Sequence, residues 1–131
     1  MKTYLLDTDI LIDYFSKNNQ AVQLVEKLNT KNKITISVIA VTELRAGWSN
    51  EKAAFYLPRL YAITEVIPLT QEIAELAGKF RFEYMRKGKS IPPIDTLMAA
   101  TAIINTSCLV TRNIRHYPMP EVELYKKMGT D

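Results

Sequence analysis

Short apolar runs alternate with longer stretches of helical periodicity, and this alternation most constrains how the chain can fold. Each run is four or five residues long, and the runs cover residues 3–6, 33–37, 66–69, 108–111 and, as a possible edge strand, 122–125. Parallel strands need a crossover of about a dozen residues or more, usually a helix, between them. The pattern therefore predicts an α/β fold with a parallel central sheet.

The clearest helical segment lies between the third and fourth runs. Its apolar residues recur at spacings of three and four, which places them on one face: Ile73, Leu76, Ala77, Phe80 and Tyr84. Thr70 is the expected N-cap of this helix and Gly88 closes it. Pro92 and Pro93 then open the next helix, because a missing N–H costs nothing in the first turn. Ser37 marks another possible helix start.

The composition fits one folded domain. The chain has 131 residues, of which 47% are apolar and 24% charged, enough for a core and an ordinary polar surface. No repeat, linker or low-complexity tract interrupts it, so we expect a single domain over residues 1–131. The formal net charge of +3 tolerates a polyanionic partner without requiring one.

The sequence predicts a protein of the cytoplasm that does not enter a membrane. It contains no apolar run of about 18 residues, and its start lacks the basic and then apolar pattern of a secretory signal. Cys108 is the single cysteine, so no internal disulfide can form. Its apolar surroundings predict a buried and inert thiol.

Three acidic residues fall near the ends of different predicted elements. Asp7 follows the first strand, Glu43 interrupts an apolar helical stretch, and Asp95 lies in the first turn of a helix. Each has an ordinary structural explanation: Asp7 as a helix cap, Glu43 on a solvent-exposed face and Asp95 as a partner of the helix dipole. None of the three indicates a function by itself.

Together, these acids point to a metal site. The carboxyl ends of parallel strands face the crevice where ligands bind. Carboxylates that meet there repel one another unless a cation neutralises them. Oxygen ligands without a cluster of histidine or cysteine suit Mg²⁺ or Mn²⁺ rather than zinc. Such an ion can polarise a phosphodiester and activate water.

Four segments carry more specific information: LLDTDILID at 5–13, SVIAVTELRAG at 37–47, IPPIDTLMAATA at 91–102 and LVTRNIRHY at 109–117. In this order and spacing they resemble the PIN-domain family, and more narrowly the VapC-type toxins of toxin–antitoxin pairs. The resemblance implies a three-layer α/β/α PIN-like domain with a parallel central sheet. It also implies Mg²⁺-dependent endoribonuclease activity, with Mn²⁺ able to substitute.

The resemblance assigns roles to particular residues. Asp7 and Asp95 match the principal metal-binding acids of the family, and Glu43 matches a further acid of the site. Asn113 stands where many members carry a fourth acid; its amide can bind a metal or orient a water but adds no charge, which puts a second tightly held metal in doubt. Asp9 could compensate for it or cap the next helix.

The mechanism that the resemblance implies is in-line attack by a metal-activated water. Glu43 would hold the water shell of the metal or position the attacking water, and Thr111 would support a metal-bound water unless it is an ordinary strand-end residue. Products with 5′-phosphate and 3′-hydroxyl ends follow from the resemblance alone.

Other side chains are candidates for contacts with RNA. Lys89, Arg112 and Arg115 could each contact phosphate, although a solvated surface position is the more ordinary role for each. His116, the sole histidine, suggests a general base, but its distance along the chain from the acids argues against this role. Trp48 could stack on a base, although packing is the more ordinary role for it.

The resemblance also implies partners. A small DNA-binding antitoxin would wrap the toxin with its C-terminal segment and place an Arg or Lys near the acids. The helix with Ile73, Phe80 and Tyr84 and the one with Trp48 are expected to offer apolar surface for the antitoxin and for a homodimer.

Two alternatives remain. A PIN-like module could bind RNA or protein without cutting it, and the amide of Asn113 keeps this possibility open. Asp7 and Asp9 after a strand are also similar to the acid pair of haloacid-dehalogenase-like phosphatases. The segment Thr111-Arg112-Asn113 lacks the late acid pair that those enzymes need, which argues against a phosphatase.

Overall fold

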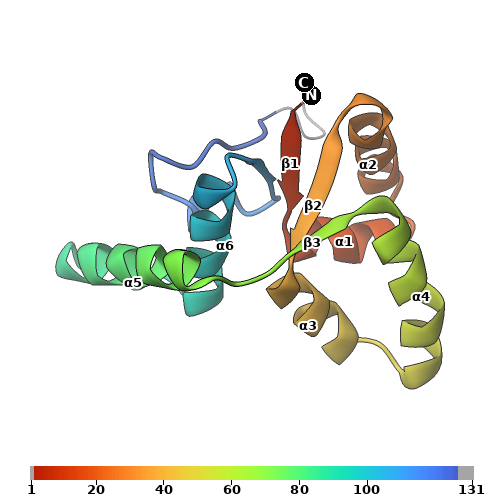
Figure 1. The fold of residues 1–131 in the computed structure, drawn as a ribbon, viewed down its shortest axis with the longest axis horizontal. Helices are drawn as coiled ribbons and strands as arrows, with labels where there is room; N and C mark the ends of the chain where they lie inside the picture. The colour runs from red at the N-terminus through yellow and green to blue at the C-terminus, as the bar shows by residue number, and fades with distance from the viewer. Residues whose placement is uncertain (1, 127–131) are drawn as a thin grey trace.

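The computed structural model describes residues 2–126, and its centre is a four-stranded parallel sheet (Figure 1). The strands are β1 Thr3–Leu6, β2 Lys33–Ser37, β3 Glu65–Ile67 and β4 Cys108–Val110. They are arranged in the order β3-β2-β1-β4, so the first strand is central and the last described strand lies beside it. The predicted parallel sheet is confirmed.

Helices connect the strands, as parallel pairing requires. They are α1 Thr8–Phe15, α2 Asn19–Lys31, α3 Val38–Ala46, α4 Asn50–Ile63, α5 Gln71–Arg86 and α6 Pro93–Ile104, followed by a 3-10 turn, Ile114–His116. The predicted caps are confirmed: the Ser37 hydroxyl accepts from the backbone N–H of Ile39, and that of Thr70 accepts from Ile73. Helix α5 ends just before Gly88, whose φ of 79° suits glycine.

The sheet separates two hydrophobic cores, which gives the three-layer α/β/α fold. Leu5 and Leu109 face one way, toward α5, α6 and the segment after β4. Their neighbours Leu6 and Val110 face the other way, toward α1, α2, α3 and α4. This alternation follows from the two-residue period of a strand. Figure 1 shows α5 and α6 on one side of the sheet and α1 and α2 on the other.

Three predicted strands are shorter in the structure. The fourth, expected over 108–111, ends one residue early at Val110. The third was expected over 66–69, but β3 ends at Ile67 because Pro68 has no N–H to donate to a ladder. The possible edge strand at 122–125 is reduced to one parallel bridge between Leu109 and Leu124.

The expected apolar partner surface is partly wrong. Ile73, Phe80 and Tyr84 are buried, because the apolar face of α5 packs against α6 and the C-terminal segment. Trp48 lies in the bend between α3 and α4 rather than on a helix, because α3 ends at Ala46.

Two smaller expectations concern the thiol and the membrane. Cys108 is free and buried, as predicted. Among residues 2–126, every helix is too short or too polar to cross a membrane.

Candidate active site

Asp7 lies where the central strand ends and α1 begins. Its backbone N–H donates to the carbonyl of Val110, which joins the end of β1 to the end of β4. Its buried carboxylate accepts two hydrogen bonds: Oδ1 from the N–H of Thr8 at 2.8 Å and Oδ2 from the hydroxyl of Tyr117 at 2.7 Å. The sheet and the C-terminal segment therefore fix this carboxylate in place.

Asp9 reaches from the first turn of α1 to the loop after β4. Its Oδ2 accepts from the N–H of Arg112 at 2.9 Å, the side-chain amide of Asn113 at 3.1 Å and the hydroxyl of Thr111 at 3.3 Å. Asp9 is therefore a link between α1 and this loop, and its bonds differ from those of a simple helix cap. Asn113 directs its amide at an acid.

Glu43 approaches the same region from α3. Its Oε1 accepts a short hydrogen bond from the hydroxyl of Thr8, the residue after Asp7. Thr8 is buried and Glu43 is half-buried. Glu43 is therefore directed inward, and the solvent-facing interpretation of this residue is wrong.

Asp95 enters from the first turn of α6 and contacts His116. Its Oδ2 lies 3.1 Å from Nδ1 of His116, in the 3-10 turn that follows β4. The expectation that His116 lies away from the acids is wrong, because the turn folds back over the start of α6. Separation along the sequence does not predict this contact.

The pKa shifts show that the four acids share one electrostatic environment. Burial and then the charge of Asp7 raise the pKa of Asp9. Burial also raises the pKa of Asp95; the charges of Asp7 and Glu43 add to this rise, and His116 opposes it. Clustered carboxylates cost free energy without a compensating cation.

The residues fit a divalent cation by the chemistry of their donors. Oδ1 of Asp9 is buried and has no hydrogen-bond partner, which is unusual for a carboxylate oxygen. Within residues 2–126, however, no three acidic, histidine or cysteine side chains form a ready-made metal cluster. Three of the acids are instead each bound to another side chain: Asp7 to Tyr117, Glu43 to Thr8 and Asp95 to His116.

The predicted RNA-contacting residues differ in their surroundings. Lys89 lies exposed in the loop before α6, and Arg115 lies exposed in the 3-10 turn. Arg112 is also exposed, but its Nε lies 2.7 Å from Oδ2 of Asp13 in an ion pair. Arg112 therefore ties the loop to α1, and phosphate would have to compete with Asp13 for it.

Thr111 is fully buried and takes part in two interactions. Its hydroxyl lies near Asp9 and accepts from the N–H of Asn113 at 3.0 Å. Thr111 therefore organises the loop that carries Asn113, a more specific role than that of an ordinary strand-end residue.

Tyr117 and Thr8 also belong to the site, although the sequence does not indicate either. Both lie inside the family-like segments at 109–117 and 5–13, but neither residue type marks a catalytic group. Burial and then the charge of Asp7 raise the pKa of Tyr117, so its hydroxyl keeps its proton and remains a donor. Only the fold brings it to Asp7, 110 residues away in sequence.

The fold and the site together define the class of protein: a three-layer α/β/α domain with acids at the carboxyl edge of a parallel sheet. The family model of the PIN domain matches residues 4–121. The chain belongs to the PIN-domain family.

Sequence comparison with curated relatives leads to the same family. The chain is 33% identical over 116 residues to ribonuclease VapC19 of Mycobacterium tuberculosis, covering 88% of this chain and 92% of that protein. It is 31% identical over 113 residues to ribonuclease VapC1 of Methanocaldococcus jannaschii, covering 86% and 77%. Ribonucleases of this kind generally depend on a divalent metal ion.

Solved structures show the same fold. The crystal structure of VapBC2 from Rickettsia felis, bound to a DNA fragment from its promoter, aligns with a TM-score of 0.84 and 29% identity, covering 94% of this chain and 97% of that one. DNA-bound VapBC from Salmonella typhimurium aligns with a TM-score of 0.82 and 26% identity, covering 95% and 98%.

Proposed function

We propose that this protein is a Mg²⁺-dependent endoribonuclease and the toxin of a type II toxin–antitoxin pair. One observation carries the proposal: four carboxylates at the carboxyl edge of the sheet lie near enough for the charges of some to raise the pKa of others, and one of their oxygens, Oδ1 of Asp9, is buried without a partner. The relatives named as VapC ribonucleases support the assignment of RNA as substrate.

Asp7, Asp95 and Glu43 would hold the metal ion, with Asp9 in support. Carboxylate oxygens in this number suit Mg²⁺, and Mn²⁺ is expected to substitute. When bound, the ion would polarise the scissile phosphate and lower the pKa of a bound water.

The chain's own residues orient the reaction. Asp7 is fixed by the bonds from Tyr117 and Thr8, so its carboxylate needs no reorganisation when the substrate arrives. Glu43 extends from α3 and positions the attacking water. Asn113 adds a neutral oxygen at the rim of the site, and Thr111 holds its loop in place.

The exposed cations contact the RNA backbone. Lys89 and Arg115 are the stronger candidates because their side chains are exposed. Arg112 would contribute only after release from Asp13. Positive charge around an acidic centre positions the phosphodiester without carrying sequence information.

The partner is a small DNA-binding antitoxin, and the neighbours solved as VapBC complexes support it. The cluster of carboxylates is a receptor for a cationic side chain of such a partner, because partly desolvated ion pairs are stronger than exposed ones. We further propose that residues 1–131 act as one domain and that the protein forms a homodimer. Its place of action would be the cytoplasm, where the RNA and the antitoxin are.

RNA cleavage by purified protein tests the nuclease assignment. Wild-type protein should cut single-stranded RNA in Mg²⁺ and not in EDTA, whereas Asp7→Asn and Asp95→Asn should abolish cleavage. Both variants should remain folded, with Asp95→Asn at least as thermostable without metal, because it removes repulsion. Glu75→Gln, which neutralises an exposed acid on α5, is the matched control. Cleavage retained by Asp95→Asn would overturn the site.

Growth of the host tests the toxin assignment. Expression of the chain alone should arrest growth, and either Asp7→Ala or co-expression of the neighbouring antitoxin gene should relieve the arrest. If wild-type protein leaves growth and total RNA unchanged and cuts no RNA when purified, the protein is a PIN-like module that binds without catalysis.

A further inference from the structure

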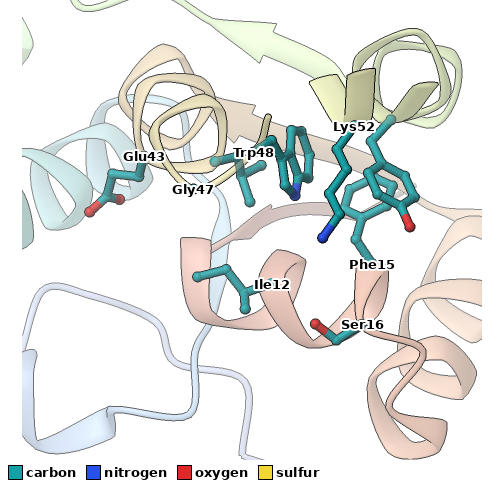
Figure 2. Close-up of a pocket in the computed structure, with 9 residues that line it drawn as sticks. Ile12, Phe15, Ser16, Glu43, Gly47, Trp48 and Lys52 are labelled. Atoms are coloured by element: carbon teal, nitrogen blue, oxygen red, sulfur yellow. The ribbon is translucent and has the colours of Figure 1, made fainter. Parts of the chain in front are cut away.

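A pocket of about 360 Å³ opens beside Glu43, between α1, α3 and α4 (Figure 2). Its lining combines aromatic rings with polar groups, among them Phe15, Ser16, Glu43, Trp48, Lys52 and Tyr56. Because Glu43 belongs to both the pocket and the group of acids, the pocket adjoins the candidate active site.

Three half-buried rings support one another in this pocket. The centroids of Phe15 and Trp48 lie 5.3 Å apart with their planes at 89°, and Tyr56 lies 5.2 Å from Trp48 and 5.1 Å from Phe15. These contacts hold the indole of Trp48 in place, while part of it remains exposed. A rigid aromatic face at the wall of a pocket binds a flat ligand with little loss of conformational entropy.

The two charged groups of the pocket lie toward different ends. Figure 2 shows Glu43 on one side of Trp48 and Lys52 on the other, with the Lys52 side chain extending from α4 toward α1. Lys52 is exposed, so its ammonium is accessible to an anion. The carboxylate of Glu43 points away from Trp48 and accepts a hydrogen bond from Thr8. A ligand in this pocket would therefore lie against the aromatic face, with the acids beyond one end and the cation of Lys52 at the other.

A nucleotide within a single strand of RNA has the matching chemistry. An unstacked base offers a flat face to aromatic rings, and its flanking phosphate pairs with a lysine. An apolar side chain of a protein partner would use the rings but leave Lys52 unused. We propose that this pocket binds the base of an unpaired nucleotide beside the scissile phosphate, with Lys52 on a flanking phosphate.

This inference rests on the proposed nuclease function and narrows its substrate class. A base in the pocket has to leave the stack, which costs least in single strands and loops. The nucleotide that enters the pocket is therefore an unpaired one.

Trp48 is the sole tryptophan of the chain, so its fluorescence reports on the pocket directly. The probe is a short single-stranded oligoribonucleotide, compared with an abasic strand of the same length. Both are added in Mg²⁺ to the Asp95→Asn protein, so that the RNA stays intact. The oligoribonucleotide should quench Trp48 saturably, and the abasic strand should not.

Cleavage by three variants that retain the catalytic acids completes the test. Trp48→Leu fills the space without an aromatic face and should raise KM for single-stranded RNA by about fivefold or more. Trp48→Phe keeps an aromatic face and should stay within about twofold of wild type. Tyr61→Leu, which removes an exposed ring of α4 that does not line the pocket, is the matched control.

The possible outcomes distinguish a wrong assignment of the pocket from a wrong assignment of the nuclease function. If wild-type protein cuts RNA and Trp48→Leu behaves as Tyr61→Leu does, the pocket assignment is overturned and the nuclease function stands. Quenching by the antitoxin but not by RNA assigns the pocket to the protein partner and also overturns the inference. If wild-type protein cuts no RNA, the proposed function fails, and the inference fails with it.

Discussion

The hydroxyl of Tyr117 donates a hydrogen bond of 2.7 Å to Oδ2 of Asp7, and both side chains are buried. This bond connects the segment after β4 to the end of the central strand. A proton donor fixed on a metal-binding carboxylate sets the direction in which its remaining lone pairs point. Tyr117 is therefore a positioning residue for the proposed metal site.

Tyr117→Phe should weaken Mn²⁺ binding by about 10-fold or more, because loss of such an outer hydrogen bond leaves the carboxylate free to rotate. The aromatic ring remains to fill the core between the sheet and α6. Calorimetric titration with Mn²⁺, alongside thermal melting without metal, separates a change in binding from a change in folding. Unchanged Mn²⁺ affinity would remove Tyr117 from the site.

Asn113→Asp should make the protein more dependent on metal. The amide of Asn113 now donates to Asp9, and an acid at this position would place two carboxylates against each other. We expect a lower melting temperature without metal, tighter Mn²⁺ binding and a larger rise in melting temperature on its addition. An equal metal response from both proteins would show that residue 113 lies away from the ion.

Arg112 and Arg115 should respond differently to the same substitution. Arg115→Gln removes an exposed cation and should weaken RNA binding. It should also reduce the salt dependence of binding, measured as the slope of log K against log salt concentration, by about one. Arg112→Gln breaks the ion pair with Asp13 and should lower the free energy of unfolding by at most about 1 kcal/mol. Titrations at several salt concentrations and denaturant melts distinguish the two. A larger loss of RNA affinity from Arg112→Gln than from Arg115→Gln would reverse these roles.

Cys108 should be unreactive in the folded protein. Burial and then the charge of Glu123 raise the pKa of this thiol from 9.0 to about 11, and only the thiolate reacts. Between about pH 9 and 11 the unfolded chain loses this proton while the folded chain keeps it, so this group lowers stability as pH rises. Alkylation should follow global unfolding below pH 9. Rapid labelling of the native protein at pH 8 would contradict this.

The sheet and its caps could be predicted from sequence because they depend on local chemistry. Ser37 and Thr70 cap helices through their own hydroxyls, and the alternation of Leu5 and Leu6 follows from strand geometry. The early end of β3 can also be predicted from the sequence, because Pro68 directly follows the strand.

The contacts between residues of the site could not be predicted from the sequence, because they join segments that lie far apart along the chain. His116 meets Asp95 only because the 3-10 turn folds over the start of α6, and Tyr117 meets Asp7 at the end of the central strand. No periodicity encodes such a pair. The position of Asp7 after a strand predicts that an acid faces the crevice, but not which donor holds it.

The place of β4 beside β1 has a consequence for protein synthesis. Strand β1 can pair with β2 after about forty residues have emerged, but Asp7 and Asp9 receive their partners from residues 111–117. A ribosome making this chain therefore carries an incomplete site until almost all of residues 1–117 have been translated and have left the exit tunnel. The acids come together late in translation, and a chain truncated before β4 lacks the residues that hold Asp7 and Asp9 in place.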